Sequence, residues 1–351
     1  MNRLQETIVR IGPLDREIMA QTQARLDNLT KPPGSLGVLE DLVKQVAGIT
    51  REVCPNLPQK VSVLMAGDHG VVAEGVSAFP AEVTPQMVLN FARGGAAMNV
   101  LSRHVGAELV LVDIGVAADL PDIPGLLRKK VAYGTANMAK GPAMTRNEAM
   151  RALETGIEIA EELVAKGARL LGTGDMGIGN TTPSTAVVAA FSGLKVEEVA
   201  GRGTGIDDRR LQLKIQAITR ALEINRPDPT DPLDVLSKVG GLEIAGLAGL
   251  MIGGAACRVP VMIDGFISGA AALVATRLAP AVKDYLIGSH LSEEPGHRVM
   301  MEMIGIKPML HMQMRLGEGT GAALAMGLVD AALKIINEMA TFADAGVSVA
   351  L

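Results

Sequence analysis

A glutamate between two glycines is the residue best placed for acid–base chemistry in this sequence. Glu318 stands in RLGEGTGAALAMG, immediately before a long apolar stretch with helical spacing. Flanking glycines let a ligand approach the backbone closely, and a positioned carboxylate can act as a general base. A carboxylate near a helix N-terminus is also stabilised by the helix dipole, by about 0.3–1 kcal/mol. The segment therefore indicates either a general base or a structural cap.

A glycine-rich segment, GTGDMGIGNTT at residues 172–182, is the second candidate. Its first three glycines match G-x-G-x-x-G, and Gly179 and Asn180 precede a stretch with helical spacing. Free backbone N–H groups at a helix start bind phosphate. A dinucleotide site also needs an acidic residue about 20 residues further on, but the segment GLKVEEVAGRG has acids without a strand. We therefore expect a phosphate site, with a turn that only packs a helix as the alternative.

Two charged residues near this segment have open interpretations. Asp175 lies within the glycine-rich segment and is either a second pocket carboxylate or an Asx-type turn residue. Lys214 lies in a helical run after GRGTGIDD, where it can bind phosphate as a point charge. A solvated lysine on a helix face is the more common finding, so that interpretation also stays open.

The histidines predict no metal centre. His69 and His290 fall at predicted strand ends, and Asp68 beside His69 favours a satisfied structural pair. The six residues between His290 and His297 match no common metal-ligand spacing. The sequence has no G-x-S-x-G elbow, no G-x-x-x-x-G-K-[ST] loop and no H-E-x-x-H motif. We expect neither a metal ion nor a serine-hydrolase triad.

These candidates must be positioned by strands. Short apolar runs lie at residues 61–66, 109–114, 169–172, 259–263 and 285–288, each followed by a glycine-containing loop. Continuous apolar runs are typical of strands buried on both faces, and helical segments between them indicate a parallel sheet with right-handed crossovers. The predicted fold class is α/β, a parallel Rossmann-like sheet flanked by helices. The loops at 67–70, 174–182, 264–269 and 288–290 would meet at its carboxyl edge, where open parallel sheets bind ligands.

The two chain ends are predicted to be helical. The first 55 or so residues have helical spacing but no strand, Ser35 can cap a helix there, and residues 321–340 read as one long helix. Thr145 and Glu148 form a possible capping box for a further helix ending near residue 166. We predict a smaller helical subdomain, residues 1–55 with part of the C-terminal helix at 321–351, beside a catalytic α/β domain at 56–320.

Composition limits the partners. The chain has 351 residues, 33 Lys plus Arg against 38 Asp plus Glu, 2 Tyr, 5 Phe and no Trp, so neither a polyanion-binding surface nor a base-stacking platform is indicated. The two cysteines suit a reducing compartment. The N-terminus is not a secretory signal, and the strongly apolar stretch at 244–257, 14 residues long, is too short to cross a bilayer. We expect a cytoplasmic protein with no nucleic-acid or membrane partner.

Several segments in collinear order closely resemble the nicotinate-nucleotide:dimethylbenzimidazole phosphoribosyltransferase family: LTKPPGSLGVLE (29–40), AGDHGVVAEGVSAFPAEVTPQMVLNFARGGAAMNVL (66–101), GDMGIGNTT (174–182), GRGTG (201–205), VMIDGFISGAAALVA (261–275) and RLGEGTGAALA (315–325). The resemblance implies a cytoplasmic homodimer that moves phosphoribose from nicotinate mononucleotide to dimethylbenzimidazole during synthesis of the cobalamin lower ligand. It also implies no metal or organic cofactor.

The resemblance assigns roles to residues. Glu318 falls on the catalytic base, and Asp175 stands where the family usually has glutamate, a side chain longer by one C–C bond of about 1.5 Å. The resemblance places phosphate contacts at Lys214, Gly177 and Ser292, and the benzimidazole pocket at Ser77, Phe79 and Gln86. Phe79 replaces an often-seen tyrosine. The remaining expected substrate contacts are Gly174, Gly179, Asn180 and Gly317.

Two rival functions are kept. A nicotinamide-dependent oxidoreductase would use the glycines at 172, 174 and 177 as its dinucleotide turn. A non-catalytic nucleotide-binding protein would retain the fold without the reaction, although the intact GEGTG and GIGNTT segments argue against it.

Overall fold

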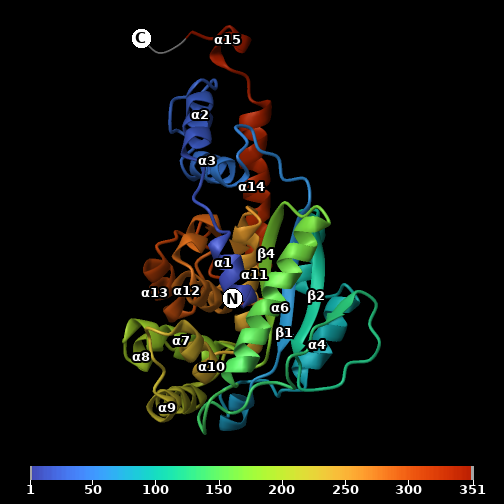
Figure 1. Ribbon diagram of the computed structural model, residues 1–351, viewed down its shortest axis with the longest axis vertical. Helices are drawn as coiled ribbons and strands as arrows, with labels where there is room; N and C mark the ends of the chain where they lie inside the picture. The colour runs from blue at the N-terminus through green and yellow to red at the C-terminus, as the bar shows by residue number, and fades with distance from the viewer. Residues whose placement is uncertain (1, 349–351) are drawn as a thin grey trace.

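A six-stranded parallel sheet forms the centre of the molecule, for which a computed structural model describes residues 2–348. The strand order is β3-β2-β1-β4-β5-β6 (Figure 1). β2 and β3 are therefore added on one side of β1, and β4, β5 and β6 on the other side. The strands are β1 (Lys60–Gly67), β2 (Ala107–Gly115), β3 (Leu126–Arg128), β4 (Leu170–Met176), β5 (Val261–Ile263) and β6 (Leu286–Gly288). This arrangement confirms the predicted α/β fold with a Rossmann-like parallel sheet.

The strands differ from the sequence prediction in two places. β4 continues four residues beyond the predicted end at 172, so Gly172 and Gly174 lie inside the strand rather than in the turn after it. β3 was not predicted, because it has only three residues and one of them is an exposed arginine, Arg128. The apolar run needed to recognise a buried strand is absent there.

Helices cover both faces of the sheet (Figure 1). One face packs against α11 (Leu242–Ala256) and α12 (Phe266–Leu278), with α6 (Arg146–Ala165) and α10 (Pro232–Val239) outside them. The other face packs against α4 (Val83–Ala92), α5 (Ala97–His104) and α14 (Thr320–Glu338). Figure 1 shows a further group of helices below the sheet, which comprises α7 (Thr181–Ser192), α8 (Val196–Val199) and α9 (Asp208–Asn225). α13 (Pro295–Ile304) packs against α7 and α8, and the 3-10 segment η1 (Gly70–Glu74) packs against α9, whereas η2 (Pro280–Tyr285) packs against α11 and α12.

The long helix α14 links the sheet to the opposite end of the molecule. Its first turns pack on β4 and β5, and its outer part lies against α3 (Val38–Thr50), which in turn packs on α2 (Arg16–Asp27) (Figure 1). The short α15 (Phe342–Ala345) follows it. α14 is long and apolar enough to cross a bilayer, but 56% of its apolar stretch is buried within this fold, as expected of a core helix.

The helices of the two chain ends lie in two different places. α2, α3 and the outer part of α14 lie together, whereas α1 (Arg3–Val9) packs against α6 and α11 beside the sheet. The boundary at residue 55 stays a prediction, and residues 349–351 of the predicted subdomain lie outside the described chain.

One of the two predicted helix starts is correct. Thr145 and Glu148 form a reciprocal capping box on α6. α3 instead begins at Val38 after Gly37, with no side-chain cap, so the prediction of Ser35 as the cap was wrong. A buried ion pair of 2.8 Å between Lys31 and Glu40 holds the preceding loop, and the Glu40 carboxylate also accepts a bond from the Leu36 N–H.

Candidate active site

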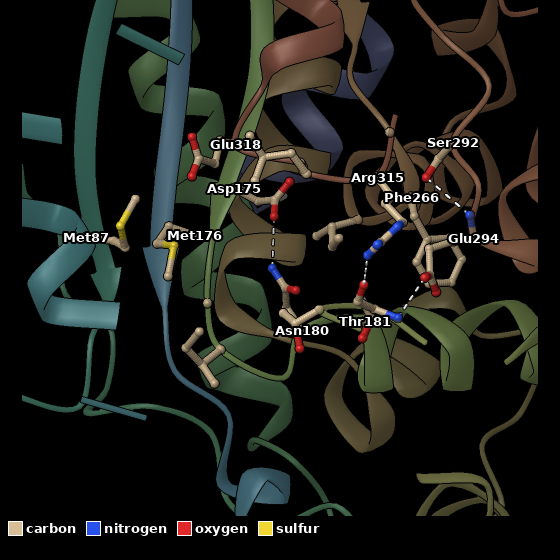
Figure 2. A pocket seen from close by; sticks show the side chains of 18 of the residues that line it. Met87, Asp175, Met176, Asn180, Thr181, Phe266, Ser292, Glu294, Arg315 and Glu318 are labelled. Atoms are coloured by element: carbon tan, nitrogen blue, oxygen red, sulfur yellow. Dashed lines mark hydrogen bonds between the residues drawn. The ribbon is translucent and has the colours of Figure 1, made fainter. Parts of the chain in front are cut away.

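A cavity of about 310 Å³ lies at the carboxyl ends of β4, β5 and β6. Its wall combines the turn after β4, the start of α12, the loop after β6 and the loop before α14. Figure 2 shows Met87 and Met176 on one side, the apolar side, and Thr181, Ser292 and Glu294 on the other, the polar side, which also holds the ring of Phe266. A volume of this size can hold a small organic ligand.

Glu318 is presented to the cavity by an unusual turn. The residues at 317, 318 and 319 have φ values of +78°, +62° and +98°, and only Glu318 among them is not glycine. A left-handed conformation costs such a residue about 1–2 kcal/mol. The side chain is 8% exposed, its Oε2 has no hydrogen-bond partner, and it lines the cavity. The first N–H groups of α14 are bonded to Asp264 instead, so Glu318 is not the cap of this helix.

Burial raises the pKa of Glu318, and the nearby negative charge of Asp264 raises it further. A hydrogen bond from the backbone N–H of Met98, at the start of α5, opposes this change in pKa. A carboxylate with a raised pKa binds a proton more strongly. Glu318 is therefore a stronger base than an ordinary glutamate.

Asp175, at the end of β4, is a second buried carboxylate in the same wall. Its Oδ1 accepts a 2.9 Å bond from the side-chain amide of Asn180, while Oδ2 has no partner (Figure 2). Burial raises the pKa of Asp175 well above its usual range, and the charges of Asp264, Glu243 and Glu318 add to this, against the Asn180 bond. The structure therefore favours a pocket carboxyl group over a local turn residue.

The glycines of the G-x-G-x-x-G pattern serve different purposes. A Cβ at Gly172 would overlap the Met326 side chain, and a Cβ at Gly174 would overlap the carbonyl oxygen of Glu318. Both glycines thus let the start of α14 approach β4. Only Gly177 and Gly179, which has a φ of +84°, lie in the turn before α7. The pattern is therefore not the dinucleotide-binding turn of the rival oxidoreductase.

Two basic residues lie in or behind the polar side of the cavity, in different environments. Lys214 has no exposed surface, and its Nζ donates to Thr181 Oγ1 at 2.8 Å and to the Gly201 carbonyl at 2.9 Å. The solvated-lysine interpretation was therefore wrong. Burial lowers the pKa of Lys214 to about 8. Arg315 lines the cavity directly and donates to the Gly203 carbonyl at 3.1 Å. Sequence reasoning missed Arg315, although it begins the RLGEGTG motif.

The structure brings most, but not all, predicted site residues to the cavity wall. Those that line it are Phe79, Asp175, Gly177, Asn180, Ser292, Gly317 and Glu318. Lys214 contacts the lining residue Thr181, and Gly179 lies between two lining residues. Ser77 accepts the backbone N–H of Phe79, and Gln86 is exposed on α4 between the lining residues Val83 and Met87. Gly174 lies behind the wall, against Glu318.

The histidines have structural partners that the sequence did not indicate. His69 Nε2 lies 2.8 Å from Glu243 Oε1, whereas Asp68 accepts the backbone N–H of Ala117, so the predicted Asp68–His69 pair was wrong. His297 Nδ1 accepts the N–H of Ser292 at 2.9 Å, and burial lowers the pKa of His297 to about 3. Within residues 2–348, the His, Cys, Asp and Glu side chains form no cluster of three or more suited to a metal ion.

A parallel α/β sheet with two carboxyl groups, an apolar wall and a basic side in one cavity defines an enzyme acting on a small molecule. A phosphoribosyltransferase family model matches residues 11–347. The nicotinate-nucleotide–dimethylbenzimidazole phosphoribosyltransferases of Geobacter sulfurreducens and Desulforamulus reducens are 60% and 59% identical to this chain, each over 99% of both sequences. The crystal structure of CobT from Thermus thermophilus matches with a TM-score of 0.92 and 50% identity, over 95% of this chain and 100% of that one. The chain belongs to the nicotinate-nucleotide–dimethylbenzimidazole phosphoribosyltransferase family and is an enzyme of that class.

Proposed function

We propose that this enzyme transfers phosphoribose from nicotinate mononucleotide to dimethylbenzimidazole, giving α-ribazole 5'-phosphate and nicotinate. The observation that carries the proposal is the position of Glu318. Its Oε2 is buried without a partner in a wall that also includes Met87, Met176 and Phe79. An aromatic base with one acidic N–H fits such a site, because the ring needs apolar contacts and the N–H needs an acceptor.

The reaction requires one proton transfer. One ring nitrogen of dimethylbenzimidazole attacks the anomeric carbon and forms the new C–N bond. The old C–N bond breaks, and its electron pair goes to the nicotinate nitrogen, which loses its positive charge. The other ring N–H of the acceptor becomes acidic as charge builds, and its proton passes to the Glu318 carboxylate. Because the leaving nitrogen is already cationic in the nucleotide, no strong general acid is required.

The C–N bond at the anomeric carbon is β in the donor and α in the product, so the enzyme must position both rings for inversion at that carbon. The attacking and leaving rings must lie on opposite sides of one ribose, so the cavity has to hold both in line. The acceptor is assigned to the apolar side, beside Glu318. The ribose and phosphate are assigned to the polar side, where Ser292, Arg315 and the start of α7 offer donors. Lys214 acts there through Thr181, whose hydroxyl it bonds.

The direct test mixes the purified enzyme with nicotinate mononucleotide and dimethylbenzimidazole, and follows nicotinate release and the product mass. Glu318→Gln keeps the size of the side chain but cannot accept the proton, so its turnover is expected to fall by about 100-fold or more. Circular dichroism of Glu318→Gln controls for folding. A folded Glu318→Gln variant with the wild-type rate would remove Glu318 from the mechanism, and no nicotinate release by the wild type would overturn the proposed function.

A further inference from the structure

The first turn of α14 is capped by a side chain from another part of the chain. Gly319, the N-cap residue, has no side chain to satisfy the free N–H groups. Asp264, directly after β5, takes this role. Its Oδ1 accepts the N–H groups of Gly321 at 2.7 Å and Ala322 at 3.1 Å, and its Oδ2 accepts the N–H of Gly319 at 3.1 Å.

Asp264 is itself held by the neighbouring strands. It is 1% exposed, its backbone N–H donates to Thr173 Oγ1 at 3.1 Å, and its carbonyl accepts from Ser289 Oγ at 3.2 Å. Thr173 belongs to β4 and Ser289 directly follows β6. The backbone of Asp264 is therefore held by hydrogen bonds to β4 and to the residue that follows β6.

The turn that carries Glu318 depends on such an anchor. Three successive residues there have positive φ, and Glu318 cannot adopt this conformation as freely as its glycine neighbours. The carboxylate atom Oε2 of Glu318 has no partner of its own. Besides the Met98 N–H that bonds the carboxylate, the hydrogen bonds that Asp264 accepts from Gly319, Gly321 and Ala322 fix the C-terminal side of this turn and so help to determine where the carboxylate points.

We infer that Asp264 is a positioning residue for Glu318: through three backbone N–H groups, one in the strained turn and two just after it, Asp264 holds that turn in place. The inference rests on the proposed function and deepens it. Asp264 is not among the residues that line the cavity, so it acts through Glu318 rather than by touching substrate.

The charge environment of Glu318 gives this inference a distinctive readout. Asp264 raises the pKa of Glu318, so its neutralisation lowers that pKa. Other titratable or charged groups in or beside the surrounding wall are Asp175 from β4, Glu243 from α11, His290 and Glu294 after β6, and Arg315 in the same loop as Glu318. α5 contributes the Met98 N–H. Neutralising Asp264 should therefore move the acid limb of the profile of kcat against pH to lower pH.

The first experiment measures turnover of Asp264→Asn between pH 4 and 9. We expect kcat to fall by about 10-fold to 100-fold, as for a small displacement of a catalytic group, KM to change less than about threefold, and the acid limb of kcat to move to lower pH. Asp113→Asn is the matched control, because Asp113 is also 1% exposed, lies on β2 near its end and accepts one backbone N–H outside the cavity. It should leave kcat and the acid limb unchanged.

A second measurement separates this inference from the proposed function. In protein labelled with ¹³C at glutamate carboxyl groups, the Glu318 signal is assigned with Glu318→Gln and titrated without substrate. A lower Glu318 pKa in Asp264→Asn supports the inference even if the wild type releases no nicotinate. An unchanged pKa in that variant overturns it. If Asp264→Asn does not fold, Asp264→Glu keeps the charge but displaces it by about one C–C bond. Lower kcat in that variant supports the inference, and wild-type kcat overturns it.

Discussion

At the scale of single residues, the cavity concentrates carboxyl groups that would repel one another if all were ionised. Asp175 has a pKa raised well above its usual range and Glu318 a raised one, in both cases mainly through burial. Two such groups with different environments are a common basis for separate acid–base roles. The more strongly affected Asp175 retains its proton to higher pH than a free aspartic acid and can then donate a hydrogen bond.

Asp175→Asn is expected to stabilise the protein near neutral pH. The stability that the native carboxyl group contributes is present below its unfolded pKa of about 3.9 and is lost as pH rises towards the higher folded pKa. Each unit of difference between the folded and unfolded pKa corresponds to about 1.4 kcal/mol in the free energy of unfolding. Thermal unfolding should therefore show a higher Tm for Asp175→Asn at pH 7, and a difference that shrinks towards pH 4. Asp122→Asn, at a fully exposed site, is the control; a lower Tm for Asp175→Asn at pH 7 would contradict this explanation.

The pKa of Lys214 leads us to expect that kcat/KM for nicotinate mononucleotide falls at basic pH, giving its pH profile a basic limb. The Lys214 pKa of about 8 means that the ammonium charge is present below pH 8 and lost above it. Since kcat/KM reports ionisation of the free enzyme, kcat/KM for nicotinate mononucleotide should fall above pH 8. Lys214→Met should lower kcat/KM throughout and abolish that limb, whereas Lys195→Met, on the surface, should retain it. An identical limb in Lys214→Met would exclude Lys214 as its origin.

Residue chemistry was predictable from the sequence only where motif and location coincide. Glu318 and Asp175 were recognised because glycines surround them and predicted strand or helix ends place them at the sheet edge. The burial of Lys214 was not recognised, because its helical spacing resembles that of a solvated lysine and only the packing of α9 against α7 removes it from water. The partner of His69 lies 174 residues away in sequence, beyond the reach of local patterns.

At the scale of elements, glycines allow unusually close contact between helices and strands. Gly156 on α6 and Gly249 on α11 each face the backbone of the opposite helix, with no room for a Cβ. Gly174 permits the same approach between β4 and the turn that carries Glu318. The sequence indicated close packing from its glycine content, but which glycine meets which element depends on the three-dimensional arrangement.

Gly174→Ala is expected to reduce both stability and turnover. The added Cβ overlaps the carbonyl oxygen of Glu318, which belongs to the backbone and can yield only by moving the turn. Overpacking of this kind costs about 1–3 kcal/mol. Urea unfolding and kcat measure the two effects. Gly141→Ala, where nothing lies within 4 Å of the added Cβ, is the matched control and should change neither. Wild-type kcat in Gly174→Ala would show that the turn tolerates displacement.

At the scale of the whole molecule, the parallel sheet followed from the sequence because β1, β2 and the start of β4 contain short, largely apolar runs. The arrangement of the chain ends did not follow, since amphipathic helices do not specify which surface they cover. α1 covers α6 and α11, while α2 and α3 meet α14 at the opposite end (Figure 1). The short segment between α1 and α2 must therefore connect two parts of the molecule.

Arg258 joins this connecting segment and the end of α3 to the sheet domain. Its guanidinium donates to the carbonyls of Ile49 and Gly48, both at 2.9 Å, and to that of Pro13 at 3.2 Å. Tyr285, whose ring lies 5.9 Å from the guanidinium carbon, donates its hydroxyl to the Gly12 carbonyl at 2.7 Å. Arg258 has a φ of +56°, a conformation that costs energy and that these bonds offset.

Arg258→Met is expected to loosen the α2–α3 end from the sheet. Methionine fills similar space but donates no hydrogen bond, so three carbonyls lose a charged donor, and the free energy of unfolding should fall by about 2–4 kcal/mol. Limited proteolysis mapped by mass spectrometry should then show faster cleavage within residues 10–55. Arg277→Met removes an exposed arginine that stacks only on Phe191, at 5.6 Å, and serves as the control. If Arg258→Met unfolded at the wild-type urea concentration and resisted protease equally, the Arg258 hydrogen bonds would not be what holds that end to the sheet.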